Sequence, residues 1–248
     1  MHISENLIPP HGLLADLRKR LEKIAEINPG AAKSAYMIGG RDEASFYSSN
    51  KKSHFDAAIA SGKSATTEDA QLVCSSEQID VVIDATGKPA VGAEIGLTAM
   101  EHGKHLVMMN VEADVTIGAY LKREAKRLGV VYTLGAGDEP SSCMELVNFV
   151  QGLGYPIVAA GKGKNNPPNI AATPDEYAEE AKRRNMNVRM LVEFVDGSKT
   201  MVEMAAISNA TGLVPDIAGM HGPAATLTEL EHVLCPEKMA EFFHAKAL

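Results

Sequence analysis

Short apolar runs alternate with amphipathic stretches in the middle of the chain, and this alternation predicts the fold. Residues 79–87, IDVVIDATG, form a nearly continuous apolar run of the kind that is buried on both faces of a parallel sheet. A helix, a strand, a helix and a strand are expected to follow at residues 90–102, 104–110, 116–128 and 130–134. This order indicates a parallel, doubly wound sheet, so the expected fold class is α/β with a Rossmann-like domain.

The flanking regions predict less regular elements. Apolar positions from Leu13 to Ile27 recur at helical spacing and predict one amphipathic helix, which Asn28-Pro29-Gly30 would end. Short helical patches are expected near residues 55–60 and 67–73.

Beyond residue 140 the pattern changes in style. Helices are expected at residues 140–153, 174–185 and 198–209, and strands at residues 155–164 (YPIVAAGKGK) and 188–197 (VRMLVEFVDG). We therefore expect a Rossmann-like dinucleotide-binding domain at residues 1–140 and an α+β domain for catalysis and dimerisation at residues 141–248.

Polar loops follow the three strong strands, at residues 84–87, 110–114 and 135–140. In open parallel sheets, ligands bind beyond the carboxyl ends of the strands, so these loops are expected to share one rim. Thr86 and Gly87 either approach a dinucleotide or form an ordinary strand-to-helix turn. Asn110 and Glu112 either face a cofactor and a substrate or begin a helix with favourable acidic charge.

The third loop holds two adjacent acids, Asp138 and Glu139. Gly135 and Gly137 begin the dinucleotide fingerprint, but Pro140 stands where that fingerprint requires glycine, so this is not the phosphate loop. One acid is expected to cap a helix whose first turn holds Pro140. The other acid would then serve proton transfer, or bind a hydroxyl group or a metal ion.

Two lysine positions carry further candidate chemistry. Lys162 and Lys164, which alternate with Gly161 and Gly163, either present ammonium groups to an anionic substrate or lie in a solvated loop. Lys199 is either a proton donor or an exposed lysine in a first helical turn. The methionine stripe that includes Met201 and Met204 is expected to be core.

Composition narrows the class of protein. The net charge of −8 disfavours a nucleic-acid partner or an anionic membrane surface. No apolar run reaches the ~20 residues of a membrane span. The 3 cysteines are far apart, which disfavours disulfides and indicates a reducing, cytoplasmic location. The histidines have no metal-ligand spacing, so we assign no metal site.

Five segments in this order carry a family resemblance: IDVVIDATGKPAVG, AMEHGKHLVMMNVEADVTIG, LGAGDEP, VAAGKGK and DGSKTMVEMAAISNATGL. They resemble the homoserine dehydrogenase-like NAD(P)-dependent oxidoreductases that often carry a C-terminal SAF domain, a group that includes deoxyxylulose-phosphate reductoisomerase-like enzymes. The resemblance implies NADP or NAD as cofactor, a small-molecule substrate and a homo-oligomer. It implies cofactor contacts from Ala85, Thr86, Gly87 and Asn110, and substrate contacts from Glu112, Asp138, Glu139, Lys162 and Lys199.

The chain also departs from the family pattern. Residues 1–27 contain no G-x-G-x-x-G, Asn110 is not followed by the lysine of true homoserine dehydrogenases, and no SAF segment is recognisable. These departures argue against homoserine as the substrate and predict a family member shortened at both ends, without its first strand and glycine-rich loop.

We expect an oxidoreductase that transfers a hydride to or from a small hydroxy or keto substrate. The alternative is a truncated, catalytically inactive binding or assembly module without a cofactor. A metal-assisted isomerase that uses Asp138 and Glu139 is a third hypothesis.

Overall fold

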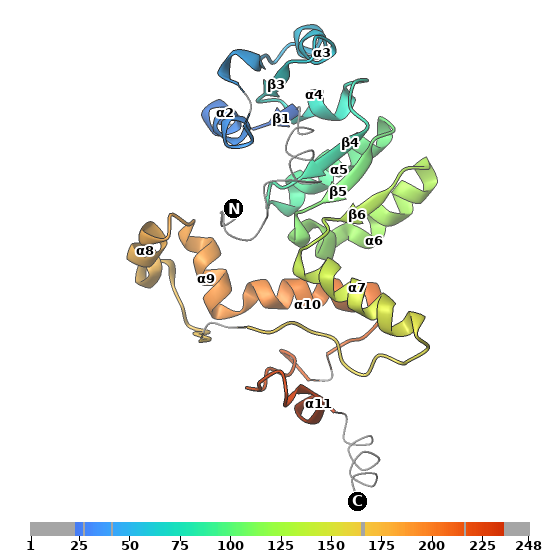
Figure 1. The fold of residues 1–248 in the computed structure, drawn as a ribbon, viewed down its shortest axis with the longest axis vertical. Helices are drawn as coiled ribbons and strands as arrows, with labels where there is room; N and C mark the ends of the chain where they lie inside the picture. The colour runs from blue at the N-terminus through green and yellow to red at the C-terminus, as the bar shows by residue number, and fades with distance from the viewer. Residues whose placement is uncertain (1–22, 27, 41, 165–166, 216, 236–248) are drawn as a thin grey trace, which may run out of the picture. The chain divides into compact units, whose positions relative to one another are not determined.

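The computed structural model describes residues 23–26, 28–40, 42–164, 167–215 and 217–235 (Figure 1). Contacts between Cα atoms divide the chain into two compact units. Unit 1 comprises Met1–Thr86, Ala90–Met108 and Tyr120–Thr133, and unit 2 comprises Gly87–Pro89, Met109–Ala119 and Leu134–Leu248. The division into domains at residue 140 stays a prediction. None of the described helices is both long and apolar enough to cross a membrane.

Unit 1 holds two parallel sheets of three strands each. The first has the order β1-β3-β2, formed by Lys23–Ala25, Ser64–Thr67 and Phe46–Ser48, and the second has the order β4-β5-β6, formed by Val81–Asp84, His105–Met108 and Tyr132–Leu134. β3 pairs in parallel with both of its neighbours, and β4 pairs in parallel with β5. The parallel α/β architecture expected from residues 79–134 is therefore present.

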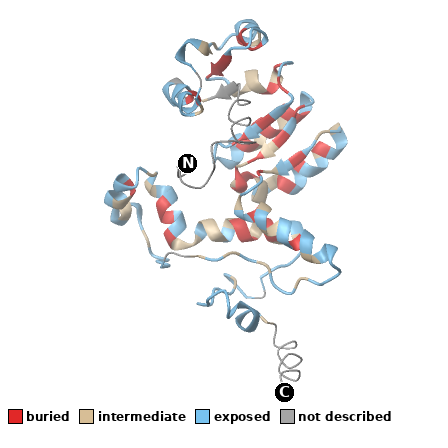
Figure 2. Ribbon diagram, in the orientation of Figure 1, coloured by how far each residue is buried: buried red, intermediate tan, exposed pale blue. Residues whose placement is uncertain are grey.

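One face of the second sheet is packed and the other is not, as the alternating colours of β4 and β5 show (Figure 2). Leu106 on β5 approaches helix α5 (Pro89–Glu101) so closely that a Cβ on Gly96 would lie 2.9 Å from it. Val81 and Ile83, on β4, point away from this contact and are about half exposed. The prediction that this strand is buried on both faces is therefore wrong for the described residues, because only one face packs against a helix.

Helix α6 (Val111–Leu128) begins five residues earlier than the expected 116–128, so residues 111–114 are its first turn and not a loop. The first turn holds Glu112 and Asp114, and carboxylates at a helix N-terminus are stabilised by the helix dipole. The expectation that this stretch enters a helix is confirmed, and the expectation of a polar loop here is wrong.

The amphipathic helix expected from Leu13 to Ile27 is not supported. Residues 1–22 and 27 lie outside the described residues, and the described part, Lys23–Ala25, is strand β1. Asn28 does not end a helix but begins α2 (Pro29–Ile38), since its side-chain oxygen accepts the N–H of Gly30 at 3.0 Å. A proline in the first turn favours the same helix start.

Four helices build the described part of unit 2 after β6: α7 (Glu139–Gly152), α8 (Pro174–Arg183), α9 (Val188–Asp196) and α10 (Ser198–Thr211), followed by the short α11 (Leu230–Val233). Helix α10 packs against α7 and α9, and α8 packs against α9 (Figure 1). The contact between α8 and α9 centres on Ala181, Leu191 and Val195.

The strand expected at residues 188–197 is helix α9, so that prediction is wrong. Leu191, Val192 and Val195 are buried, and this spacing is that of one helix face. Asn187 caps the helix, because its side-chain oxygen accepts the N–H of Arg189 at 2.9 Å. Gly197, with a left-handed φ of +88°, then ends α9 and begins α10.

The strand expected at residues 155–164 is also wrong, because this segment is neither strand nor helix. Lysine side chains, and not the backbone hydrogen bonds of a sheet, connect this segment to the helices. Lys162 pairs with Glu139 at the start of α7 and with Glu203 on α10, and the Lys164 ammonium donates to the carbonyl oxygen of Phe194 on α9. The strands that would make the second domain α+β are thus absent from its described part.

Candidate active site

Two groups of charged residues meet within unit 2. The first, which we call the Lys162 cluster, consists of Lys162, Glu139 and Glu203, and the second is the pair of Lys199 with Glu112. Lys199 also lies near enough to Glu139 for its charge to lower the pKa of that carboxyl group. Four of these five side chains were expected to face a substrate, and the structure brings them into one region. They are Glu112, Glu139, Lys162 and Lys199.

The start of α7 separates the roles of the two adjacent acids. The N–H of Ser141 donates to Asp138 Oδ1 at 2.9 Å, so Asp138 is the helix cap. Glu139 is the first residue of the helix, and its Oε1 lies 3.1 Å from Lys162 Nζ. The expectation that one acid caps the helix is confirmed, and the second acid binds a lysine.

The second carboxylate oxygen of Asp138 takes no part in the helix cap. Oδ2 is buried and has no hydrogen-bond partner among the described residues. A buried oxygen without a partner favours proton transfer or a bound polar group at this position. Within the described part of the chain, no three acidic, histidine or cysteine side chains are arranged to hold a metal ion.

The Lys162 cluster places a cation between two unequal carboxylates. The side chain of Glu203 is 3% exposed, whereas that of Glu139 is 53% exposed. Burial disfavours the charged form of Lys162, but hydrogen bonds from its ammonium to Glu203 and Glu139 outweigh burial and raise its pKa. Burial also acts against the charged form of Glu139, yet a backbone hydrogen bond and Lys162 lower its pKa overall. Lys162 and Glu139 therefore stay charged at neutral pH.

The second pair joins distant parts of the chain. Lys199 Nζ, in the first turn of α10, lies 2.7 Å from Glu112 Oε1, in the first turn of α6. Their side chains are 22% and 28% exposed, so both ends of the pair remain reachable by water or by a small ligand. An ammonium in this position can donate a proton or a hydrogen bond to a substrate oxygen.

The loop after β4 is a hydrogen-bonded turn with open space beside its glycine. Asp84 is buried and its Oδ1 accepts the N–H of Thr86 at 3.1 Å, which fixes the turn that carries Ala85. Gly87 has a left-handed φ of +65°, and a Cβ added there would find open space. A bound group can thus approach this backbone closely, which fits the contacts that the resemblance implies for Ala85, Thr86 and Gly87.

Asn110 is engaged within the protein. It is 1% exposed, its side-chain amide donates to the carbonyl oxygen of Lys88 at 3.0 Å, and its side-chain oxygen accepts the N–H of Ala113 at 3.2 Å. Asn110 therefore fixes the loop around Lys88 to the start of α6. Its expected contact with the nicotinamide stays a prediction.

Glu203 was missed in the sequence. It lies beside the methionine stripe of α10, of which Met204 and Ile207 are buried as expected, while Met201 is half exposed. A carboxylate at the buried face of a helix implies a cation from elsewhere in the chain. That implication is the signal that could have identified Glu203.

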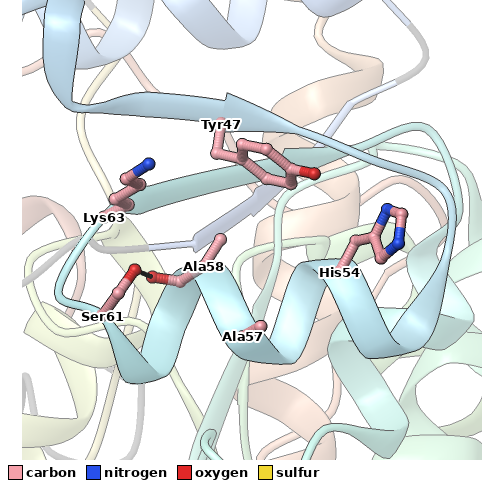
Figure 3. Close-up of a pocket in the computed structure, with 6 residues that line it drawn as sticks. All are labelled: Tyr47, His54, Ala57, Ala58, Ser61 and Lys63. Atoms are coloured by element: carbon pink, nitrogen blue, oxygen red, sulfur yellow. Dashed lines mark hydrogen bonds between the residues drawn. The ribbon is translucent and has the colours of Figure 1, made fainter.

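Two pockets are lined by residues other than these charged ones. One pocket of about 240 Å³ is lined by α3 (Lys52–Ala60) and its neighbours, with the ammonium of Lys63 5.7 Å from the ring centre of Tyr47 (Figure 3). Another, of about 260 Å³, is lined by Met201 and other residues of α10 together with the segment around Met220. Neither contains a residue of the predicted site.

Two family models match the chain, in the order that the sequence predicted. Residues 39–134 match the homoserine dehydrogenase NAD-binding domain. Residues 137–248 match the catalytic domain of oxidoreductase DRL. No curated protein matches the chain.

One solved structure that resembles the chain is an NAD binding oxidoreductase from Klebsiella pneumoniae, with 16% identity and a TM-score of 0.32. The likeness covers 44% of this chain and 29% of that protein, so the chain spans less than a third of its length. The two family models confirm the resemblance: residues 39–134 are similar to the NAD-binding domain of homoserine dehydrogenase, and residues 137–248 are similar to the catalytic domain of oxidoreductase DRL.

Proposed function

We propose that this chain acts as an NAD(P)-dependent oxidoreductase that transfers a hydride to or from a small hydroxy or keto substrate. The observation that carries the proposal is the set of ion pairs that Lys162 and Lys199 form with three carboxylates. Four of these five residues lie in the stretch that matches an oxidoreductase catalytic domain, and the fifth, Glu112, begins helix α6. When bound, a nicotinamide cofactor supplies the hydride chemistry, which no amino-acid side chain provides.

The protein's own residues bind and orient the substrate. Lys162 and Lys199 donate hydrogen bonds to the substrate oxygen and stabilise the negative charge that develops on it during reduction of a carbonyl group. Asp138 Oδ2, which is buried and has no partner in the described part of the chain, accepts or returns the proton of the substrate hydroxyl group. Ala85, Thr86 and Gly87 would hold the cofactor through backbone contacts.

The proposal is tested by titrating the full chain with NADH and with NADPH and recording the nicotinamide fluorescence. We expect saturable binding of at least one of them below about 1 mM, the upper end of the usual range for enzyme substrates. Absence of binding of both up to that concentration would contradict the proposal. The same titration shows which of the two cofactors is preferred.

A matched pair of glycine variants locates the binding site. Gly87→Val should weaken cofactor binding by about tenfold or more, because the side chain occupies the space through which the backbone meets the ligand. Gly62→Val is the control, since Gly62 has a similar φ of +76° and equally open surroundings in the turn before β3. Equal weakening by both variants would show that backbone strain alone is responsible.

The alternative of a catalytically inactive module gains no support from the comparisons, since both matched models describe oxidoreductase domains. It predicts a folded chain that leaves both nicotinamides unbound.

A further inference from the structure

Glu203 is a carboxylate on the buried side of α10. The other buried residues of this helix are Met204, Ala206 and Ile207. A carboxylate in such surroundings stays ionised only with a counter-ion, because transfer of an unpaired charge out of water is strongly unfavourable. Lys162 is this counter-ion, and it reaches Glu203 from a segment that has no secondary structure of its own.

The two carboxylates of the Lys162 cluster differ in what happens when the ion pair opens. Glu139, with more than half of its side chain exposed, can leave Lys162 and be hydrated. Glu203 cannot leave without stranding its charge in an apolar environment, since its side chain is almost fully buried. Glu203 is therefore the permanent counter-ion, and Glu139 is the exchangeable one.

This asymmetry has a consequence for the substrate. A lysine ammonium has three N–H donors, and within the described residues two of them are used by Glu203 and Glu139. We propose that Glu203 is a positioning residue that holds Lys162 charged and in place, so that its third N–H and the one released by Glu139 reach a hydroxyl or carbonyl oxygen of the substrate. The substrate part of this inference rests on the proposed function.

The electrostatics of the cluster support the same assignment. Burial alone would favour a neutral lysine, which could act as a base. Both carboxylates act against burial, and the pKa of Lys162 is raised. Lys162 is thus a hydrogen-bond donor at neutral pH, and Glu203 is the partner that stays when Glu139 moves away.

The test measures the charge of Lys162 through its rate of acetylation. Only the neutral amine attacks an acetylating reagent, so a charged lysine reacts slowly. The full-length protein is labelled between pH 7 and 10, and the modified peptides are quantified by mass spectrometry. We expect Glu203→Gln to speed the labelling of Lys162 by about tenfold, because a neutral amide no longer favours the ammonium form. Glu139→Gln should speed it by less, about two- to threefold, since water screens this carboxylate.

Two variants complete the set. Glu112→Gln is the matched control, because it removes the partner of Lys199 and should leave the labelling of Lys162 at the wild-type rate. Glu203→Asp keeps the charge and should restore most of the slow labelling. A folded Glu203→Gln protein, shown by circular dichroism, that labels Lys162 at the wild-type rate over the whole pH range would overturn the proposal.

A comparison within the wild type covers the case in which Glu203→Gln fails to fold. Unfolding the wild type in urea separates Lys162 from both carboxylates, so the unfolded protein is the reference for the folded one. Lys162 should react several-fold more slowly in the folded protein than in the unfolded protein, and equal rates would overturn the proposal. Titration of the same samples with NADH and NADPH tests the proposed function separately, because labelling reports the role of Glu203 whether or not a nicotinamide binds.

Discussion

Lys162 and Lys199 are almost equally exposed, yet the carboxylates around them differ. Lys162 is shared by two carboxylates, one of which is almost fully buried, whereas Lys199 has one ion-pair partner among the described residues, Glu112, which water also reaches. An ion pair between exposed groups contributes little to stability, but a buried charge depends on its partner. Exposure of the lysine itself therefore does not determine its contribution to stability. Burial of the carboxylate with which it pairs does.

Removal of each ammonium in turn tests the difference between the two lysines, and it should have the largest effect. Lys162→Met should lower the free energy of unfolding by about 3 kcal/mol, because it leaves the charge of Glu203 buried without a partner. Lys199→Met should lower it by about 0.5 kcal/mol, since water can hydrate Glu112. Urea unfolding of the two variants measures both values. Similar losses would show that the two lysines are equivalent.

A smaller effect separates the helix start from the ion pair that it carries. Asp138→Ala should destabilise the protein by about 1 kcal/mol, because Ser141 loses the acceptor of its N–H. Asp138→Asn keeps a side-chain acceptor and should remain within a few tenths of a kcal/mol of the wild type. Thermal unfolding of both variants is the measurement. A full loss in the asparagine variant would mean that the negative charge, and not the cap, is what matters.

The smallest expected effect is a dependence on pH. The pKa of Glu139 is lowered in the folded chain, so its contribution to stability is complete above the pKa of the unfolded carboxyl group and is lost as the pH falls through the lowered value. Glu139→Gln should therefore lie below the wild type by less than about 1 kcal/mol at pH 7 and approach it in acid. Urea unfolding between pH 3 and 7 tests this. A gap that stays constant in acid would contradict it.

Lys162 shows the opposite dependence, at alkaline pH. Its raised pKa means that the lysine stabilises the folded chain below the pKa of an unfolded lysine, and that this contribution is lost as the pH rises through the raised value. The Lys162 cluster is thus stabilising over the whole range between the two titrations, which includes neutral pH.

The sequence predicted elements well where apolar residues dominate a strand, and poorly where they do not. The runs that became β4 and β5 stand out because valine, isoleucine, leucine and methionine dominate them, and Val130 and Val131 directly precede β6. Strand β3 is buried along its whole length but reads Ser-Ala-Thr-Thr, so a hydrophobic pattern cannot reveal it. Thr67 satisfies its hydroxyl group with Asn50 at 2.9 Å, which is a contact that only the folded chain defines.

The sequence predicted four of the charged residues of the candidate site, but it did not predict which of them form ion pairs with each other. Glu112, Glu139, Lys162 and Lys199 were singled out because each follows an apolar run or lies in a glycine loop. Their pairing depends on how α10 packs against α7 and on the start of α6, which no local pattern encodes. Segment 188–197 was misread for a related reason: β-branched residues favour strands, but packing against α8 selected the helix.

The left-handed Gly197 joins two helices at a single residue and stands two positions before Lys199. Any side chain here would strain the backbone, and relief of that strain would swing the first turn of α10 relative to α9. The backbone conformation of Gly197 therefore fixes the direction in which α10 leaves α9, and with it the position of Lys199 in the first turn of α10.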